Sequence, residues 1–353
     1  MAERVLMKGN EAIAEAAIRA GCRHYFGYPI TPQTEIAAYM AKRMPKIGGV
    51  FLQAESEIAA INMVYGVAGT GLRVMTSSSS PGVSLKGEGI SYLAGSDLPA
   101  LIVNVQRGGP GLGGIQPSQS DYFQATRGGG HGDYHLIVMA PASVQEMADM
   151  TAKCFDLSDK YRVPAMILAD GTLGQMMEPV VLPEPTEYKP NKPWAVTGTK
   201  GERKHNIINS LYLKPEILEQ TNFERFERYK KIEENECMYE SFMMEDAEYC
   251  VVAFGIAARV SKNAVVAARK AGIKVGLIRP ITLWPFPKDV LKKAAEQVKG
   301  FLSVELSMGQ MIEDVKLAVN CAKPVELCNR TGGMIVTPEE VYAAIEKLAK
   351  ENA

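Results

Sequence analysis

The stretch RVMTSSSSPGVSLKGEGISYLAGSDLPALIVNVQ, residues 73–106, decides the fold. It opens with a short apolar run that ends in serines (73–79), continues with a helical pattern (83–95) and closes with an almost wholly apolar run (99–106). Apolar strands separated by helices of about 10–15 residues are typical of a parallel sheet that is covered on both faces. The stretch therefore predicts a strand, a helix and a second strand of such a sheet.

The same alternation continues on both sides of this stretch. Further strands are expected at 5–7, 23–27, 50–55, 135–140 and 163–170. Helices are expected between them, and Asn10 is a suitable N-cap for the first. A parallel α/β domain is therefore predicted over residues 1–178.

The composition changes after this domain. The stretch EPVVLPEPTEYKPNKP (178–193) has five prolines, and ERFERYKKIEENE (224–236) is strongly charged. Residues 179–247 are therefore predicted to be a proline-rich linker followed by a charged helical arm, to which we assign no chemistry. A second alternation of strands and helices predicts a compact α/β domain over residues 248–353.

Composition and charge exclude several classes of protein. The 353 residues are 46% hydrophobic and 22% charged, with a formal net charge of −1. A balanced charge argues against nucleic acid or an anionic membrane as a partner. No apolar run approaches the roughly 18–20 residues of a membrane span, and the start lacks a signal-peptide core, so a cytoplasmic protein is expected. The six cysteines form no C-x-x-C pair, so neither a zinc nor an iron–sulfur motif is predicted.

In parallel α/β sheets, ligands bind beyond the carboxyl ends of the strands, so the loops that follow the strands are the candidate sites. The first such loop is GYPITP (27–32), in which Pro29 and Pro32 bracket Thr31 and its hydroxyl. A plain proline-stiffened turn is the alternative. The second is QAESEIAA (53–60), where Glu57 begins an apolar helix. A carboxylate at the start of a buried helix needs a partner, because burying it unpaired is costly. The alternative is an acid that only complements the helix dipole.

Two more loops carry polar groups. In TSSSSPG (76–82), Ser79 and Ser80 lie in a hydroxyl-rich loop that either binds a polar ligand or caps the next helix. The long segment 106–135 contains nine glycines, and loops of this length are usually functional or disordered. Arg107 stands at its start, where a guanidinium is suited to hold a carboxylate with two parallel hydrogen bonds. An ordinary surface arginine is the alternative.

Taken together, these motifs resemble a known family. The chain is similar over nearly its whole length to the α-type subunit of 2-oxoacid:ferredoxin oxidoreductases, which are thiamine diphosphate enzymes. The resemblance rests on GYPITP, AESEIAAINM, TSSSSPG, NVQRGGPG, GLIRPITLWPFP and ELSMGQ. The segment 107–135 looks most like the branched-chain type, which acts on 3-methyl-2-oxobutanoate (2-oxoisovalerate). The implied fold is a pyrimidine-binding domain of thiamine enzymes followed by a transketolase C-terminal-like domain.

The resemblance also implies roles for individual residues. Glu57 matches the glutamate that hydrogen-bonds N1′ of the cofactor's aminopyrimidine, which tunes the electronics of the cofactor. Thr31 matches a threonine near cofactor and substrate, and Arg107 matches the arginine that binds the substrate carboxylate. The implied cofactor-binding residues are Glu57, Thr31, Pro29, Ser79 and Ser80. The implied reaction converts a 2-oxoacid, CoA and oxidised ferredoxin to acyl-CoA, CO₂ and reduced ferredoxin.

The same resemblance implies that this chain supplies only part of an enzyme. Thiamine enzymes hold the diphosphate through Mg²⁺ on a G-D-G motif with a following Asn, and the near match Ala169-Asp170-Gly171 lacks that Asn. A β-type subunit is therefore expected to bring the diphosphate and Mg²⁺. A γ-type subunit, a ferredoxin-like subunit with the iron–sulfur clusters and an external ferredoxin are the other expected partners, in an anaerobic cytoplasm. The alternatives are 2-oxoglutarate, pyruvate or an aryl pyruvate as substrate, or a non-catalytic assembly subunit.

Overall fold

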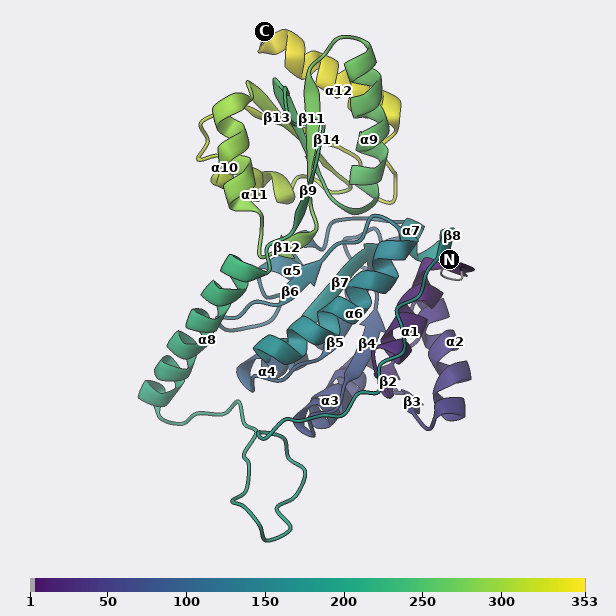
Figure 1. Ribbon diagram of the computed structural model, residues 1–353, viewed down its shortest axis with the longest axis vertical. Helices are drawn as coiled ribbons and strands as arrows, with labels where there is room; N and C mark the ends of the chain where they lie inside the picture. The colour runs from purple at the N-terminus through teal and green to yellow at the C-terminus, as the bar shows by residue number, and fades with distance from the viewer. Residues whose placement is uncertain (1–3, 353) are drawn as a thin grey trace.

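Two sheets of different size organise the chain, as Figure 1 shows for the computed structural model, which describes residues 4–352. The larger sheet has seven strands in the order β12, β6, β7, β5, β4, β2, β3. Their bounds in that order are Thr282–Trp284, Ile137–Met139, Ala165–Asp170, Leu101–Gln106, Val74–Ser78, His24–Gly27 and Val50–Gln53. All neighbouring pairs are parallel except β12 with β6, and β4, β5 and β7 are buried along their whole length. The parallel α/β fold predicted from the sequence is confirmed.

The handedness of the crossover connections determines which face of the larger sheet each helix covers. Strand-to-strand connections in parallel sheets are right-handed, so helices that lead in opposite directions along the sheet cover opposite faces. Helices α1 (Gly9–Arg19), α2 (Thr34–Arg43) and α6 (Val144–Tyr161) pack together, and α3 (Glu57–Gly69) packs on α4 (Ser80–Gly95). The stretch 73–106 is therefore β4, α4 and β5, as predicted.

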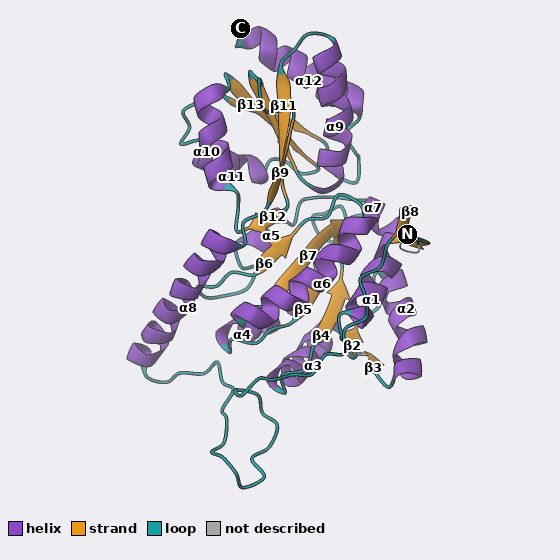
Figure 2. Cartoon of the chain, viewed as in Figure 1, coloured by secondary structure: helices purple, strands orange, loops and turns teal. Residues whose placement is uncertain are grey.

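The smaller sheet lies at the other end of the molecule (Figures 1 and 2). Its order is β14, β13, β10, β11, β9, with bounds Val325–Asn329, Gly300–Glu305, Tyr249–Ala253, Val275–Pro280 and Tyr239–Phe242. Its strands are parallel except β9, which runs antiparallel to β11. The helices around it are α9 (Gly255–Lys270), α10 (Lys288–Gln297), α11 (Met311–Ala318) and α12 (Pro338–Glu351).

Two strands lie across the predicted boundaries of the domains. Strand β9 falls within residues 179–247, the range predicted as linker and arm, yet it pairs in the smaller sheet. Strand β12 falls within residues 248–353, yet it pairs with β6 of the larger sheet. The sequence carried no signal for this exchange, because both strands are only three or four residues long. The division at 178 and 247 stays a prediction.

The carboxyl edges of the two sheets face each other, and Gln119 joins them. Its amide nitrogen donates to the carbonyl of Phe254, which follows β10, at 2.9 Å. Its amide oxygen accepts from the backbone N–H of Leu306, which follows β13, at 3.0 Å. The loop that carries Gln119 comes from the carboxyl end of β5, so the long segment 106–135 is wedged between the sheets.

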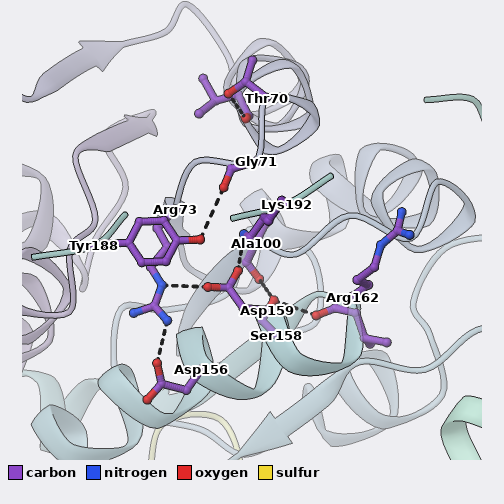
Figure 3. Close-up of polar contacts among 12 residues, drawn as sticks. Thr70, Gly71, Arg73, Ala100, Asp156, Ser158, Asp159, Arg162, Tyr188 and Lys192 are labelled. Carbon is purple, nitrogen blue, oxygen red and sulfur yellow. Dashed lines mark hydrogen bonds and ion pairs between the residues drawn. The ribbon is translucent and has the colours of Figure 1, made fainter. Parts of the chain in front are cut away.

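The linker crosses the opposite, amino edge of the larger sheet. Figure 3 shows Arg73, which precedes β4, held by Asp156 at 2.6 Å and Asp159 at 2.9 Å, both on α6. The linker residue Tyr188 stacks on this guanidinium with 4.5 Å from its ring centre to Cζ. Lys192 of the linker pairs with the same Asp159. This cluster fastens the proline-rich linker to the domain that it leaves.

The remaining elements connect these layers. The predicted charged arm is the long helix α8, and a small antiparallel sheet joins β1 to β8. Their bounds, with those of the short helices, are α8 Pro215–Asn235, β1 Val5–Lys8, β8 Met177–Val180, η1 Met44–Ile47, α5 Tyr122–Thr126 and α7 Gly171–Gln175. Within residues 4–352, no helix combines the length and apolar character that crossing a bilayer requires.

Candidate functional site

The junction of β4 and α4 is the centre of the candidate site. Parallel strands end at one edge of a sheet, so the loops after β2, β3, β4 and β5 converge there. The serine-rich loop turns sharply at this point, because β4 ends at Ser78 and α4 already begins at Ser80. Ser79 is the N-cap in an extended conformation, but its hydroxyl makes no capping hydrogen bond. The alternative prediction, that these serines only cap the helix, therefore fails for the Ser79 side chain.

The structure brings Thr31 and Arg107 into direct contact. Arg107 directly follows β5, is only 7% exposed and donates from Nη1 to the Thr31 carbonyl at 3.0 Å. Its Nη2 donates to the Leu112 carbonyl at 3.0 Å, while its Nε is buried without a partner among residues 4–352. A guanidinium has five N–H groups, so donors remain for a further acceptor. The alternative of an ordinary surface arginine is wrong.

Ser80 links Arg107 to a half-buried acid that the sequence analysis missed. Its hydroxyl donates to Asp121 Oδ2 at 2.5 Å and accepts from the Arg107 backbone N–H at 3.0 Å. Asn104, on β5, donates to the same Asp121 oxygen at 2.9 Å. Burial raises the pKa of Asp121, although both hydrogen bonds oppose the shift. Asp121 lies in the glycine-rich segment, and SQSD (118–121), its most polar stretch, was the signal available.

A cavity of about 560 Å³ opens beside this group, and both halves of the chain line it. The larger-sheet side contributes Ser80, Arg107 and Asp121. The smaller-sheet side contributes Met308, Gln310 and Thr331. A second cavity, of about 670 Å³, lies beyond Thr31. The site is therefore an interface between the two sheets.

Glu57 lies on the other side of the same junction. It is the first residue of α3, is 5% exposed, and makes no ion pair or hydrogen bond within residues 4–352. A Cβ placed on Gly82 of α4 would lie 2.6 Å from Glu57 Oε1 and 2.1 Å from Ser78 Oγ. Glycine at this position therefore lets the carboxylate and the hydroxyl approach the first turn of α4.

Several buried polar atoms at this junction have no hydrogen-bond partner among the described residues. They are Thr76 Oγ1, Ser78 Oγ, Ser79 Oγ and Arg107 Nε. Buried polar groups in folded proteins are normally paired, and each exception calls for an explanation. Hydroxyls beside a carboxylate and a glycine fit the polar edge of a nitrogen heterocycle, so the residues present suit a thiamine pyrimidine.

The loop that carries Thr31 is held from below by side chains that the sequence analysis did not assign. The amide of Asn10 donates to the Pro32 carbonyl at 2.8 Å and to Glu35 at 2.8 Å. The prediction that Asn10 is the N-cap of the first helix is wrong, because α1 begins at Gly9 and its N-cap is Lys8. The buried Gln33 accepts from the hydroxyl of Ser77 at 2.5 Å. These contacts fix the loop, whereas the predicted site residues Pro29 and Thr31 are themselves exposed on it.

Asp170, the near match to a diphosphate motif, has a structural task. Its Oδ1 accepts from the backbone N–H of Thr172 at 2.9 Å and of Leu173 at 3.1 Å, so it is the N-cap of α7. Burial raises its pKa to about 6 in spite of these bonds. Within residues 4–352, no three side chains of His, Cys, Asp or Glu are grouped to hold a metal ion.

Comparison with known proteins identifies the family. The model of a family described as pyruvate flavodoxin/ferredoxin oxidoreductase, thiamine diphosphate-binding, matches residues 15–242. That of pyruvate:ferredoxin oxidoreductase core domain II matches residues 247–341. The chain belongs to the pyruvate flavodoxin/ferredoxin oxidoreductase family. Its resemblance to 2-oxoacid:ferredoxin oxidoreductases is thereby confirmed, and residues 15–242 match the thiamine diphosphate-binding part of the family.

Relatives with high coverage include two kinds of subunit. Ketoisovalerate oxidoreductase subunit VorB of Methanothermobacter marburgensis is 53% identical, covering 98% of each chain. 2-Oxoglutarate synthase subunit KorA of Methanothermobacter thermautotrophicus is 37% identical, covering 99% of this chain and 100% of the relative. Both are named as subunits, so members of the family work within multi-subunit oxidoreductases.

A solved structure shows the same fold. The 2-oxoglutarate:ferredoxin oxidoreductase of Magnetococcus marinus, with 2-oxoglutarate, coenzyme A and succinyl-CoA bound, superposes with a TM-score of 0.87 at 28% identity. The match covers 98% of this chain and 65% of that chain. The additional third of that chain has no counterpart among residues 1–353.

Proposed function

We propose that this chain is the thiamine-binding subunit of an oxidoreductase that decarboxylates 3-methyl-2-oxobutanoate, the 2-oxoacid also called ketoisovalerate. The oxoacid and CoA become an acyl-CoA and CO₂, and two electrons pass to ferredoxin. The observation that carries the proposal is the unpaired, buried Glu57 carboxylate beside Ser78 and the Cβ-free Gly82. A family that binds thiamine diphosphate needs a carboxylate at the cofactor's pyrimidine, and Glu57 meets that need.

The chain's own residues have separable tasks in this scheme. Thiamine diphosphate, when bound, supplies the nucleophilic carbon and the electron sink. Glu57 would hold the pyrimidine by accepting a hydrogen bond from it, with the unpaired hydroxyls of Ser78 and Ser79 as further polar groups. Arg107 uses its free Nε–H and Nη–H groups for the oxoacid carboxylate, and Ser80 and Asp121 hold its backbone in place. Thr31 lines the cavity of about 670 Å³ next to Arg107, and Pro29, two residues before it, stays a proposed cofactor-binding residue.

The substrate assignment is supported by the order of similarity. Two subunits named for ketoisovalerate are 51–53% identical to this chain, and one named for 2-oxoglutarate is 37% identical. The partner subunits are a finer proposal: a β-type subunit with Mg²⁺, a γ-type subunit, and a ferredoxin-like subunit with the iron–sulfur clusters. It rests on the missing Asn after Asp170 and on the scattered cysteines. A cytoplasmic location stays a prediction.

The test is made on the complex, purified anaerobically with its partners and supplied with thiamine diphosphate, Mg²⁺ and CoA. Viologen dye reduction is followed with 3-methyl-2-oxobutanoate, 2-oxoglutarate, pyruvate and an aryl pyruvate in parallel. The highest kcat/KM is expected with 3-methyl-2-oxobutanoate. A clear preference for another oxoacid would overturn the substrate assignment, and no reduction with any of them would support a non-catalytic assembly subunit.

A further inference from the structure

A lysine is fully buried in the helix that faces Glu57. Lys86 lies on α4 with 0% of its surface exposed, a rare position for a lysine. Its ammonium donates to the Ser77 carbonyl at 3.1 Å, the one acceptor found for it within residues 4–352. An ammonium has three N–H groups, so two donors lack a protein acceptor there. Hydrogen bonding alone therefore does not account for a lysine at this position.

Glu57 is the charged group beside this part of α4, because a Cβ on Gly82, one turn before Lys86, would lie 2.6 Å from Glu57 Oε1. Its carboxylate raises the pKa of Lys86, while burial, the larger effect, lowers that pKa to about 7. Of the elements around α4, β4 and β5 carry no titratable side chain. On α3 the other titratable residue is Tyr65, which bonds Ser96 at the far end of α4. Tyr25 of β2 bonds the Ser77 hydroxyl, and His131 touches α4 through its carbonyl to Ser91.

The two groups form no direct ion pair within 4.0 Å, yet each is the other's natural counter-charge. Glu57 and Lys86 sit on the packed helices α3 and α4, where the interior is apolar and charges are weakly screened. A buried charge is costly without a counter-charge, so the ammonium of Lys86 and the carboxylate of Glu57 stabilise each other.

We infer that Lys86 is a positioning residue for the thiamine chemistry: its buried ammonium is the counter-charge that holds the Glu57 carboxylate at the first turn of α4, where the cofactor can donate a hydrogen bond to it. The inference rests on the proposed function, because it assigns Lys86 a task through Glu57. Lys86 touches the backbone of β4 at Ser77, so the positive charge lies directly beneath the loop of Ser78 and Ser79.

A purely structural role for Lys86 predicts that its substitution changes stability and leaves turnover unchanged. Replacing a poorly partnered buried charge with an apolar side chain of similar shape removes the cost of burying that charge. Lys86→Met should therefore raise the melting temperature if Lys86 is only a buried charge with a poor partner set. If it acts on Glu57, the same stable variant must also lose function, and that combination separates the two roles.

The first experiment uses the cofactor-free full chain and needs no activity. Thermal unfolding of Lys86→Met, Glu57→Gln and the double variant is compared between pH 6 and 10. The lowered pKa of Lys86 means that the unfolded chain holds its proton up to about pH 10.5 and the folded chain only up to about pH 7. The stabilisation by Lys86→Met should thus be full at pH 7 and vanish towards pH 10.5. It should be larger in the Glu57→Gln background, where the ammonium has lost its counter-charge.

The second experiment measures the Lys86→Met complex with its partner subunits. We expect about a tenfold loss of kcat at pH 7 with a change of less than about twofold in KM for the oxoacid, because the Glu57 carboxylate loses the charge that positions it while Arg107 is untouched. Ile90→Val, an equally buried change one turn along α4, is the control and should shift neither quantity.

The outcomes distinguish the inference about Lys86 from the proposed function. Coupled stabilities together with the loss of kcat would support the inference. Additive stabilities, or a Lys86→Met complex that keeps the kcat of wild type, would overturn it. An inactive wild-type complex would overturn the proposed function instead, and the cofactor-free cycle would still decide whether Lys86 and Glu57 interact.

Discussion

The two ends of strand β4 carry buried polar groups of opposite character. At its amino end, Arg73 is 8% exposed and bonds to Asp156, Asp159 and the Ala20 carbonyl, with Tyr188 stacked on it (Figure 3). At its carboxyl end, Ser78, Ser79 and Arg107 keep buried polar atoms without partners in the described chain, and Lys86 has a single acceptor.

The difference separates a polar cluster that stabilises the fold from a group of hydrogen-bonding atoms that are free to bind a ligand. A satisfied polar cluster makes the fold more rigid, whereas unsatisfied buried groups cost free energy that a structural role does not recover. Proteins retain such costs mainly at functional sites. Substitutions at the amino edge should therefore change stability alone, and substitutions at the carboxyl edge should change function more than stability.

The largest effect is expected from Glu57→Gln. It removes the charge and keeps the shape, so turnover by the assembled complex should fall about 1,000-fold, a typical loss for a group that handles protons. The melting temperature should change little, because the removed cost of burying the carboxylate is offset by the counter-charge that Lys86 loses. Viologen assays and thermal unfolding measure the two effects. Activity within a factor of three of wild type would remove Glu57 from the mechanism.

Arg73→Met tests the other end of the comparison. The change removes the buried bonds of Arg73 to Asp156, Asp159 and the Ala20 carbonyl and leaves Asp159 with Lys192 alone, so the free energy of unfolding should fall by about 3 kcal/mol. Turnover per folded complex should be unchanged. Urea titration gives the first quantity, and assays corrected for the folded fraction give the second. Tyr188→Phe, which removes only a 3.4 Å hydrogen bond to the Gly71 carbonyl, is the matched control and should cost less than about 0.5 kcal/mol.

Arg107→Lys should weaken substrate binding more than it slows turnover. Lysine keeps the charge but loses the planar fork that bonds the Thr31 and Leu112 carbonyls and leaves Nε free. We expect KM for the oxoacid to rise about tenfold, with a smaller change in kcat. Arg127→Lys, in the same glycine-rich segment but exposed, is the control. An unchanged KM would show that the carboxylate binds elsewhere.

Asp170→Asn should have the smallest effect and a defined pH dependence. The pKa of Asp170 is about 6 in the folded chain and 3.8 as its ordinary value. The stabilising effect of that raised pKa is therefore complete below about pH 4 and is lost as the pH rises through 6. The variant should gain on the order of 1 kcal/mol relative to wild type between pH 4 and 7. Parallel pH curves from urea titrations would contradict this.

The fold was largely predictable because hydrophobic patterning and turn residues agree along the chain. The runs at 73–79 and 99–106 are β4 and β5, and the helix between them is α4. The exchange of β9 and β12 was not predictable, because strands of three or four residues acquire their partners from tertiary packing.

Site residues that directly follow a strand could be predicted from the sequence. Residues that reach the site from a loop or from the middle of a helix could not. Glu57, Ser80 and Arg107 each stand just beyond a strand, so position alone placed them. Asp121 lies in a segment without strong local preferences. Lys86 had a signal that was overlooked: it is three residues after Val83 and four before Ile90, on the buried stripe of α4.

The exchange of β12 has a consequence for how the chain can be divided. A fragment cut at residue 247 would lack residues 282–284 and would leave the backbone of β6 unpaired along one side. Open strand edges recruit other chains, so such a fragment would tend to aggregate even with its core intact. Each half of the chain therefore contributes a strand to the sheet of the other half, and neither half can be expressed or fused to another protein as a complete domain.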